Sequence, residues 1–240
     1  LTKECTVTGE PLSLHINEQG TFAMVAVKTW PCSIVDLRLP VKTINQITSE
    51  SPVLTQTFHA TEDIYTQLNE NGIKTSYNTQ TRQISTEALQ IKSKLTTAAI
   101  SSDGTVITYA DSLSQITTSH SGKYNVWEFG ELQKTLSPKA FRFSPDGQSV
   151  VAISPQGIAW QTGLLQGTLK TNAFETNPIN DVAWCNNTSV ALCVDGPHSA
   201  KGELLLFNLD SRVLSTHPFD SKPWTIKVSP DLSRTAVVFQ

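Results

Sequence analysis

The sequence has 240 residues and a formal net charge of −3, and 16% of its residues are charged; this length suits a single domain with a substantial core. So small a charge creates no field that would steer the chain onto nucleic acid or anionic lipid, so direct nucleic-acid binding is not expected. The longest apolar run, Phe22 to Val27, is far shorter than the roughly 20 residues that cross a bilayer, so membrane insertion is not expected either.

A tight-turn signature recurs along the chain at steps of about 42 residues. It is clearest in Ser-Pro-Asp-Gly at 144–147, where Pro145 presets φ at the first corner and Gly147 can adopt the positive φ of the exit. The equivalent turn residues are Gly20, Asp63, Gly104, Gly147, Asn187 with Thr188, and Leu232. Four short strands per step are typical of a β-propeller blade and not of a helical solenoid.

The first two repeats each contain four predicted strands. Their inner strands are apolar runs and their outer strands are polar, because the central strands of a blade are covered on both faces. In repeat one we expect strands at 12–16, 22–27, 34–39 and 42–48. In repeat two we expect them at 53–58, 64–68, 73–78 and 82–86.

The remaining repeats differ mainly in their loops. Repeat three is predicted to have strands at 97–100, 106–109, 124–129 and 132–136, with a Ser- and Thr-rich loop from Asp111 to Gly122. Repeat four is compact, with three strands between Ala140 and Trp160. Repeat five is predicted to have strands at 180–184, 190–194, 204–209 and 212–216, with a loop from Asp195 to Gly202. Repeat six begins with strands at 224–228 and 235–239.

Together these repeats predict an all-β fold: one β-propeller domain over residues 1–240, with about five and a half four-stranded antiparallel blades of a six- or seven-bladed ring. The sixth repeat stops after two strands, which would leave an unpaired sheet edge. We therefore expect a domain that is incomplete at its C-terminal end. Closure by Cys5 to Thr8, a β-prone stretch before repeat one, is a compatible alternative.

The residue pairs at the predicted third strands resemble those of the WD-repeat family of β-propellers, in which Trp-Asp follows aliphatic residues. The pairs in this chain are Val35-Asp36, Tyr77-Asn78, Trp127-Glu128, Trp160-Gln161 and Phe207-Asn208. No pair is a true Trp-Asp, and the Gly-His dipeptide that usually opens a repeat is missing, so the resemblance implies divergent blades. Dipeptidyl-peptidase and TolB-like propellers share the Ser-Pro-Asp-Gly turn and remain alternative subfamilies.

The sequence contains none of the common catalytic or nucleotide-binding motifs, such as Gly-x-Ser-x-Gly, Gly-x-x-x-x-Gly-Lys or His-Glu-x-x-His. We therefore predict a protein that is not an enzyme and that has no catalytic residue, cofactor or metal site. His15 and His59 fall on or beside inner strands and are predicted to be structural. His120 and His198 fall in predicted second-to-third-strand loops and are the one pair worth testing for a metal.

Two further groups of residues have a structural interpretation. Aspartate recurs in the predicted turns, at Asp103, Asp146 and Asp231. Calcium sites are an alternative, but aspartate stabilises such turns through its own backbone without an ion. The four cysteines, Cys5, Cys32, Cys185 and Cys193, lack zinc-site spacing and disulfide density, so we expect reduced, small-hydrophobe roles and an intracellular protein, cytoplasmic or nuclear.

Asp36-Leu37-Arg38 resembles the Asp-x-Arg box with which some WD-repeat substrate receptors dock onto the cullin-4 adaptor. It lies at the end of the predicted third strand, near the position expected for such a box. The alternative is an ordinary solvated charge pair. Asp210-Ser211-Arg212 is a second, offset match.

The WD-repeat resemblance implies a non-catalytic scaffold that binds other protein subunits of a larger complex. Aromatic side chains near loop ends are the predicted anchors, whereas Trp160 and Trp184 are expected in the core. We predict that the partner contacts the face of the second-to-third-strand loops. The candidate protein-binding residues are Trp30, Asp36, Arg38, Ser119, His120, His198 and Trp224. The alternatives are a propeller hydrolase, a peptidase-associated propeller, a subunit of a ribonucleoprotein assembly and a cullin-4 ligase substrate receptor.

Overall fold

A computed structural model of the chain describes residues 11–17, 19–27, 32–38, 42–59, 62–128, 137–167, 169–196, 201–212, 214–229 and 233–239. The chain folds into two compact units. Unit 1 comprises Leu1–Leu95 and Ser102–Gly104, and unit 2 comprises Thr96–Ser101 and Thr105–Gln240. The described part of the chain contains no helix of the length and apolarity that a membrane span requires.

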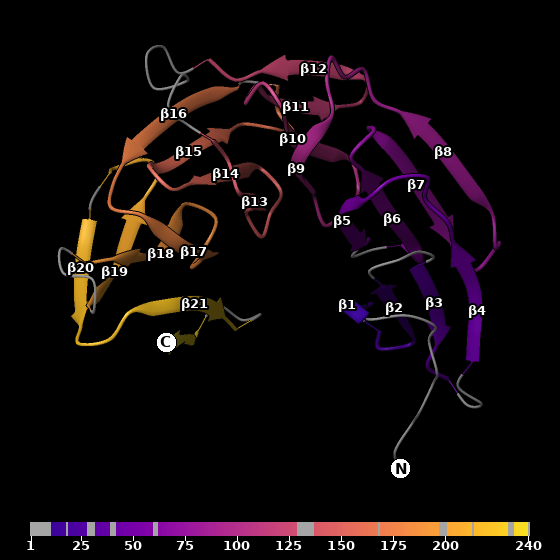
Figure 1. Cartoon of the computed structure of the whole chain (residues 1–240), viewed down its shortest axis with the longest axis horizontal. Coiled ribbons are helices and arrows are strands. Elements are labelled where there is room, and N and C mark those ends of the chain that lie inside the picture. Colours follow the sequence, from indigo (N-terminus) through magenta and orange to yellow (C-terminus); the bar gives the residue numbers. More distant parts are fainter. Residues whose placement is uncertain are drawn as a thin grey trace. The chain divides into compact units, whose positions relative to one another are not determined.

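Unit 1 contains two four-stranded antiparallel sheets whose strands pair in chain order (Figure 1). The first sheet consists of β1 (Pro11–Ile16), β2 (Phe22–Val27), β3 (Cys32–Asp36) and β4 (Lys42–Ile47). The second consists of β5 (Val53–Phe58), β6 (Ile64–Asn69), β7 (Ile73–Asn78) and β8 (Ile84–Ala88). These bounds confirm the predicted strands of repeats one and two to within a few residues.

Unit 2 continues the same pattern. The third sheet consists of β9 (Leu95–Ile100), β10 (Val106–Asp111), β11 (Ile116–His120) and β12 (Lys123–Val126). The fourth consists of β13 (Ala140–Phe143), β14 (Ser149–Ser154), β15 (Gly157–Thr162) and β16 (Lys170–Glu175). The fifth consists of β17 (Ile179–Trp184), β18 (Ser189–Asp195), β19 (Gly202–Asn208) and β20 (Leu214–Phe219). The last sheet is the two-stranded pair β21 (Pro223–Val228) and β22 (Thr235–Phe239).

The described residues therefore form five four-stranded antiparallel sheets in series and a two-stranded one. Each sheet is a simple meander, which is the build of a propeller blade. The predicted fold class, an all-β fold made of blades, is confirmed.

The first turn of every sheet is closed by the same hydrogen bond. The last residue before the turn donates its backbone N–H to the carbonyl of a residue at or near the start of the second strand. The pairs are Asn17 with Phe22, His59 with Ile64, Ser101 with Val106, Ser144 with Ser149, Cys185 with Ser189 and Ser229 with Arg234, at 2.8 to 3.1 Å. Gly20, Gly104 and Gly147 occupy equivalent corners with φ of 64°, 72° and 68°, as the sequence predicted.

The prediction for repeat three was wrong in one element. The expected loop from Asp111 to Gly122 contains the third strand, β11, and the segment expected as the third strand is the fourth, β12. Two tight turns replace the loop: Asp111 Oδ1 accepts the N–H groups of Leu113 and Gln115 at 2.9 Å, and the hairpin from β11 to β12 turns on residues with positive φ at 121 and 122. The strand expected at 132–136 lies outside the described residues.

Hydroxyl side chains explain why β11 was missed. Ile116 is the only apolar residue of the strand, so no apolar alternation is visible in the sequence. The strand is nevertheless buried, because its hydroxyls find partners inside. Thr118 Oγ1 lies 3.1 Å from Thr108 Oγ1 and accepts the indole N–H of Trp127 at 2.8 Å.

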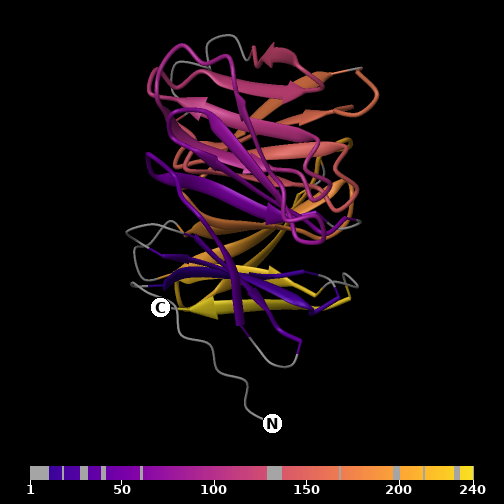
Figure 2. The same ribbon diagram turned by 90° about the vertical axis from the view of Figure 1, so that its right-hand side faces the viewer.

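The core of unit 2 lies between neighbouring sheets. Figure 2 shows these sheets as successive layers. Trp160 and Trp184 are 1% and 7% exposed, as expected for core residues. Trp160 packs edge-on against Phe207 with ring centroids 5.4 Å apart.

Candidate functional site

Asp36 and Arg38 form an ion pair within the turn that follows β3. Arg38 Nε and Nη2 donate to Asp36 Oδ1 and Oδ2 at 2.9 and 2.7 Å, and the backbone N–H of Arg38 also donates to Oδ1. These bonds, more than the charge of Asp36 itself, raise the pKa of Arg38. The guanidinium lies 4.9 Å from the centroid of the Phe22 ring. The pair thus holds its own turn together, and its role as a docking box stays a prediction.

Ser119 and His120 do not lie in a loop, contrary to the prediction. Both belong to β11, where Ser119 is buried and His120 pairs with Val106 and Lys123 beside the hairpin turn. By register, His120 holds the place of Asp36 and Asn78, each of which pairs with the first residue of its second strand.

Two of the quoted third-strand pairs are misplaced. Trp127-Glu128 follows the fourth strand, β12. In the fourth sheet, Thr162 pairs with Ser149, the first residue of β14, so Trp160-Gln161 is one residue too early.

Trp224 lies at an irregularity of β21, where the register with β22 shifts between Pro223 and Thr225. Its side chain is 59% exposed. An exposed indole on a strand is what the anchor hypothesis requires, and that hypothesis stays a prediction. The other predicted anchor, Trp30, and the histidine His198 lie outside the described residues.

His59 takes part in a partly buried chain of polar groups in unit 1. Its Nε2 lies 2.8 Å from Thr66 Oγ1, which in turn lies 2.9 Å from Ser76 Oγ. Its Nδ1 lies 3.8 Å from Glu62 Oε2. Burial lowers the pKa of His59, so the neutral ring is favoured. The acid of Glu62, the imidazole of His59 and the hydroxyl of Thr66 stand in the same order as the catalytic groups of a hydrolase. Thr66, however, is fully buried and beyond the reach of a substrate.

Asp146, Cys32 and Cys193 have structural surroundings, whereas Asp231 and the stretch Cys5 to Thr8 lie outside the described residues. Asp146 Oδ1 accepts the Ser144 hydroxyl at 2.6 Å and the N–H of Gln148 at 3.0 Å, which is the turn chemistry that the sequence predicted. Burial raises the pKa of Cys32 and of Cys193 to about 11, so both are thiols at neutral pH. In the described ranges, no group of three or more His, Cys, Asp and Glu side chains is placed to hold a metal ion.

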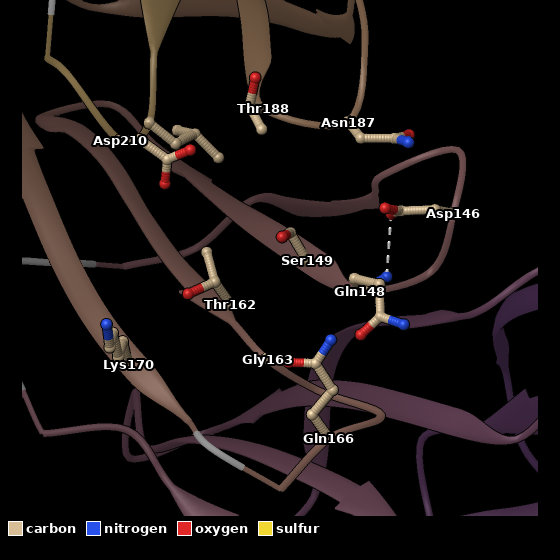
Figure 3. A pocket seen from close by; sticks show the side chains of 11 residues that line it. Asp146, Gln148, Ser149, Thr162, Gly163, Gln166, Lys170, Asn187, Thr188 and Asp210 are labelled. Carbon is tan, nitrogen blue, oxygen red and sulfur yellow. Dashed lines mark hydrogen bonds between the residues drawn. The ribbon is translucent and has the colours of Figure 1, made fainter.

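In unit 2, a polar pocket of about 350 Å³ lies between the fourth sheet of the chain, β13 to β16, and the fifth, β17 to β20 (Figure 3). It opens where first strands turn into second strands and third strands into fourth. Its lining residues are Asp146, Gln148, Ser149, Thr162, Gly163, Gln166, Lys170, Asn187, Thr188, Leu209 and Asp210. We call it the unit 2 pocket.

Unit 1 has a corresponding pocket of about 570 Å³ between its two sheets. Its lining residues are Gln19, Thr21, Phe22, Arg38, Glu62, Asp63, Ile64, Asn78 and Gln80. We call it the unit 1 pocket. Of the predicted site residues, it contains Arg38.

The two pockets are built from the same register positions. Counted from the first-turn residues Asn17 and Ser144, Gln19 corresponds to Asp146 and Thr21 to Gln148. On the neighbouring sheet of each pocket, Gln80 corresponds to Asp210, because each stands two residues after the last residue of a third strand. The repeat thus places a pocket at the same turns in each unit.

Sequence reasoning placed the binding surface at the opposite ends of the strands. One part of its premise, a long second-to-third-strand loop at Asp111 to Gly122, is wrong. The two pockets lie at the first and third turns. The recurrence of the turns was visible in the sequence. The position of Asp146 and Asn187 on one pocket, from turns of neighbouring sheets, was not.

No protein-family model and no curated protein sequence matches the chain. Among solved structures, a chain of Kuenenia stuttgartiensis hydrazine synthase is similar over 98% of this chain and 75% of that chain, with a TM-score of 0.66 and 12% sequence identity. At this identity the similarity shows the fold alone, and it agrees with the series of blades described above.

Proposed function

We propose that the chain is a non-catalytic scaffold, a divergent WD-repeat-like propeller that binds other protein subunits within an intracellular multi-subunit complex. The observation that carries the proposal is the pair of register-equivalent pockets. Each is walled by short turns on rigid sheets, and turn residues can change without disturbing the strands. Such a surface suits the recognition of a partner segment by shape and hydrogen bonding.

The chemistry around the pockets supports binding over catalysis. The unit 2 pocket contains carboxylates, amides, hydroxyls and one ammonium group, but none of its lining residues is a histidine or a cysteine. The arrangement in the described structure that most resembles a hydrolase, His59 with Thr66, has its hydroxyl fully buried. These features favour the scaffold over the propeller hydrolase.

Filling the unit 2 pocket with a large side chain should release the partner. Thr188 is exposed and lines the pocket, so Thr188→Trp occupies it without entering the core. The tagged chain would be purified from its native cells and the stoichiometry of its partners measured. We expect the bound fraction to fall at least about tenfold for Thr188→Trp, because the indole takes up the space of the partner segment and the complex then dissociates faster.

The matched control is Thr216→Trp, on an exposed position of β20 outside both pockets. It should retain the partners, and both variants should keep the thermal midpoint of the original chain. Equal retention by the two variants would contradict the proposal. So would a monomeric chain that turns over a small molecule.

A further inference from the structure

The unit 2 pocket has more hydrogen-bond acceptors than the chain itself uses. Asp146 engages partners through Oδ1, and its Oδ2 has none among the described residues. The carboxylate of Asp210 likewise has no hydrogen bond or ion pair to a described residue; only its backbone N–H is engaged, to Asn208 at 3.0 Å. Figure 3 shows the two carboxylates on opposite sides of Thr188 and Ser149.

Gln148 adds an unused acceptor to the same pocket. Its Oε1 is buried and has no partner within the described structure. An unpaired buried carbonyl is costly, and a donor brought by a ligand would remove that cost. Gln148 is one of the residues that line the pocket.

The charged residues that line the unit 2 pocket give it a net negative charge. The lining contains two carboxylates, Asp146 and Asp210, and one ammonium group, Lys170. The lining of the unit 1 pocket also contains more carboxylates than cations. It contains Glu62 and Asp63, while its one cation, Arg38, is already paired with Asp36.

From these observations we infer that the unit 2 pocket binds a basic side chain of the partner protein, an arginine or a lysine. This inference rests on the proposed function and specifies the partner segment. A guanidinium has five N–H donors and no acceptor, which complements a pocket with spare acceptor oxygens. Arginine therefore binds more tightly than lysine, because it can donate to carboxylate and amide oxygens at once.

The inference is tested with short fluorescein-labelled peptides, Gly-Ser-Arg-Ser-Gly and its lysine, citrulline and glutamate counterparts, by fluorescence anisotropy on the full chain. We expect binding in the order arginine, lysine, citrulline, with none for glutamate. Binding should weaken as salt is raised, because exposed charges are screened. Asp146→Asn with Asp210→Asn should weaken arginine-peptide binding at least about tenfold, since charge-assisted hydrogen bonds are the strong ones. Asparagine keeps the oxygen that accepts from Ser144 and Gln148, so the turn is preserved.

Two variants serve as controls. Asp220→Asn removes a carboxylate that is 97% exposed and outside the pocket, and it should leave the affinity unchanged. Lys170→Ala removes the competing cation and should strengthen binding by a few-fold. No binding of the arginine peptide, equal binding of the glutamate peptide, or an unchanged affinity in the double variant would overturn the inference.

The inference and the proposed function fail in different ways. If Thr188→Trp releases the cellular partner but the double asparagine variant retains it, the pocket is a docking site and its basic specificity is wrong. If Thr188→Trp retains the partner, the docking site itself is wrong, whatever the peptides do.

Discussion

At the level of single residues, glycine has two distinct roles in the recurring first turn. Gly104 and Gly147 both have positive φ, a conformation that costs other residues roughly 1 kcal/mol or more. A Cβ at Gly147 would meet nothing within 4 Å, whereas a Cβ at Gly104 would overlap the His59 ring. Backbone conformation alone requires glycine at 147. At 104 the close approach of a histidine requires it as well.

These surroundings predict unequal costs for the same substitution. Gly147→Ala should lower the free energy of unfolding by about 1 kcal/mol, from strain alone. Gly104→Ala should cost at least about 1 kcal/mol more, because the ring of His59 must also shift and weaken its bond to Thr66. Urea denaturation of both variants measures the difference. Equal losses would mean that the ring does not pack against this turn.

At the level of secondary-structure elements, β11 shows how hydroxyl side chains build a buried strand. Thr108 and Thr118 pair across β10 and β11, and Trp127 donates to Thr118 from the end of β12. Each polar group is satisfied internally, which is the condition for burying it. A strand of this kind has the composition of a loop.

Thr118→Val removes the shared hydroxyl at nearly constant volume. It should lower the free energy of unfolding by about 1–3 kcal/mol, because the Trp127 N–H and the Thr108 hydroxyl lose a buried partner. Thr216→Val, at an exposed position of β20, should change it by less than about 0.5 kcal/mol. A negligible effect at Thr118 would restore the interpretation of residues 111–122 as a loop.

Across the molecule, each unit is stabilised by apolar layers between successive sheets. In unit 2, β14 supplies alternate residues to two of these layers: Val151 and Ile153 to the layer with the fifth sheet, and Val150 and Ala152 to the layer with the third. A central strand covered on both faces is an apolar run for this reason. The apolar side chains of the strands fill the layers, whereas the polar residues of the first and third turns line the pockets.

Trp160 and Trp224 are expected to differ in their effect on stability, because Trp160 is buried and Trp224 is exposed. Trp160→Ala should cost about 3–5 kcal/mol in the unfolding of unit 2, because the indole fills the layer against Phe207. Trp224→Ala should change stability by less than about 0.5 kcal/mol, since its side chain is largely exposed. Chemical denaturation followed by circular dichroism distinguishes the two. A loss below about 1 kcal/mol for Trp160→Ala would mean that its inward orientation is wrong.

The blade pattern could be predicted from the amino-acid sequence, because the chemistry that sets turns and strands acts within a few residues. Turn residues such as Gly20 and Gly147 set the corners, and apolar runs such as Phe22–Val27 set the inner strands. The assignment of β11 and the location of the pockets needed the folded structure. The burial of Thr118 depends on a partner hydroxyl and an indole from other strands. The unit 2 pocket is lined by Asp146 and Asp210, which come from turns of neighbouring sheets far apart in the chain. Contacts between sheets follow from how layers pack, which no short stretch of sequence specifies.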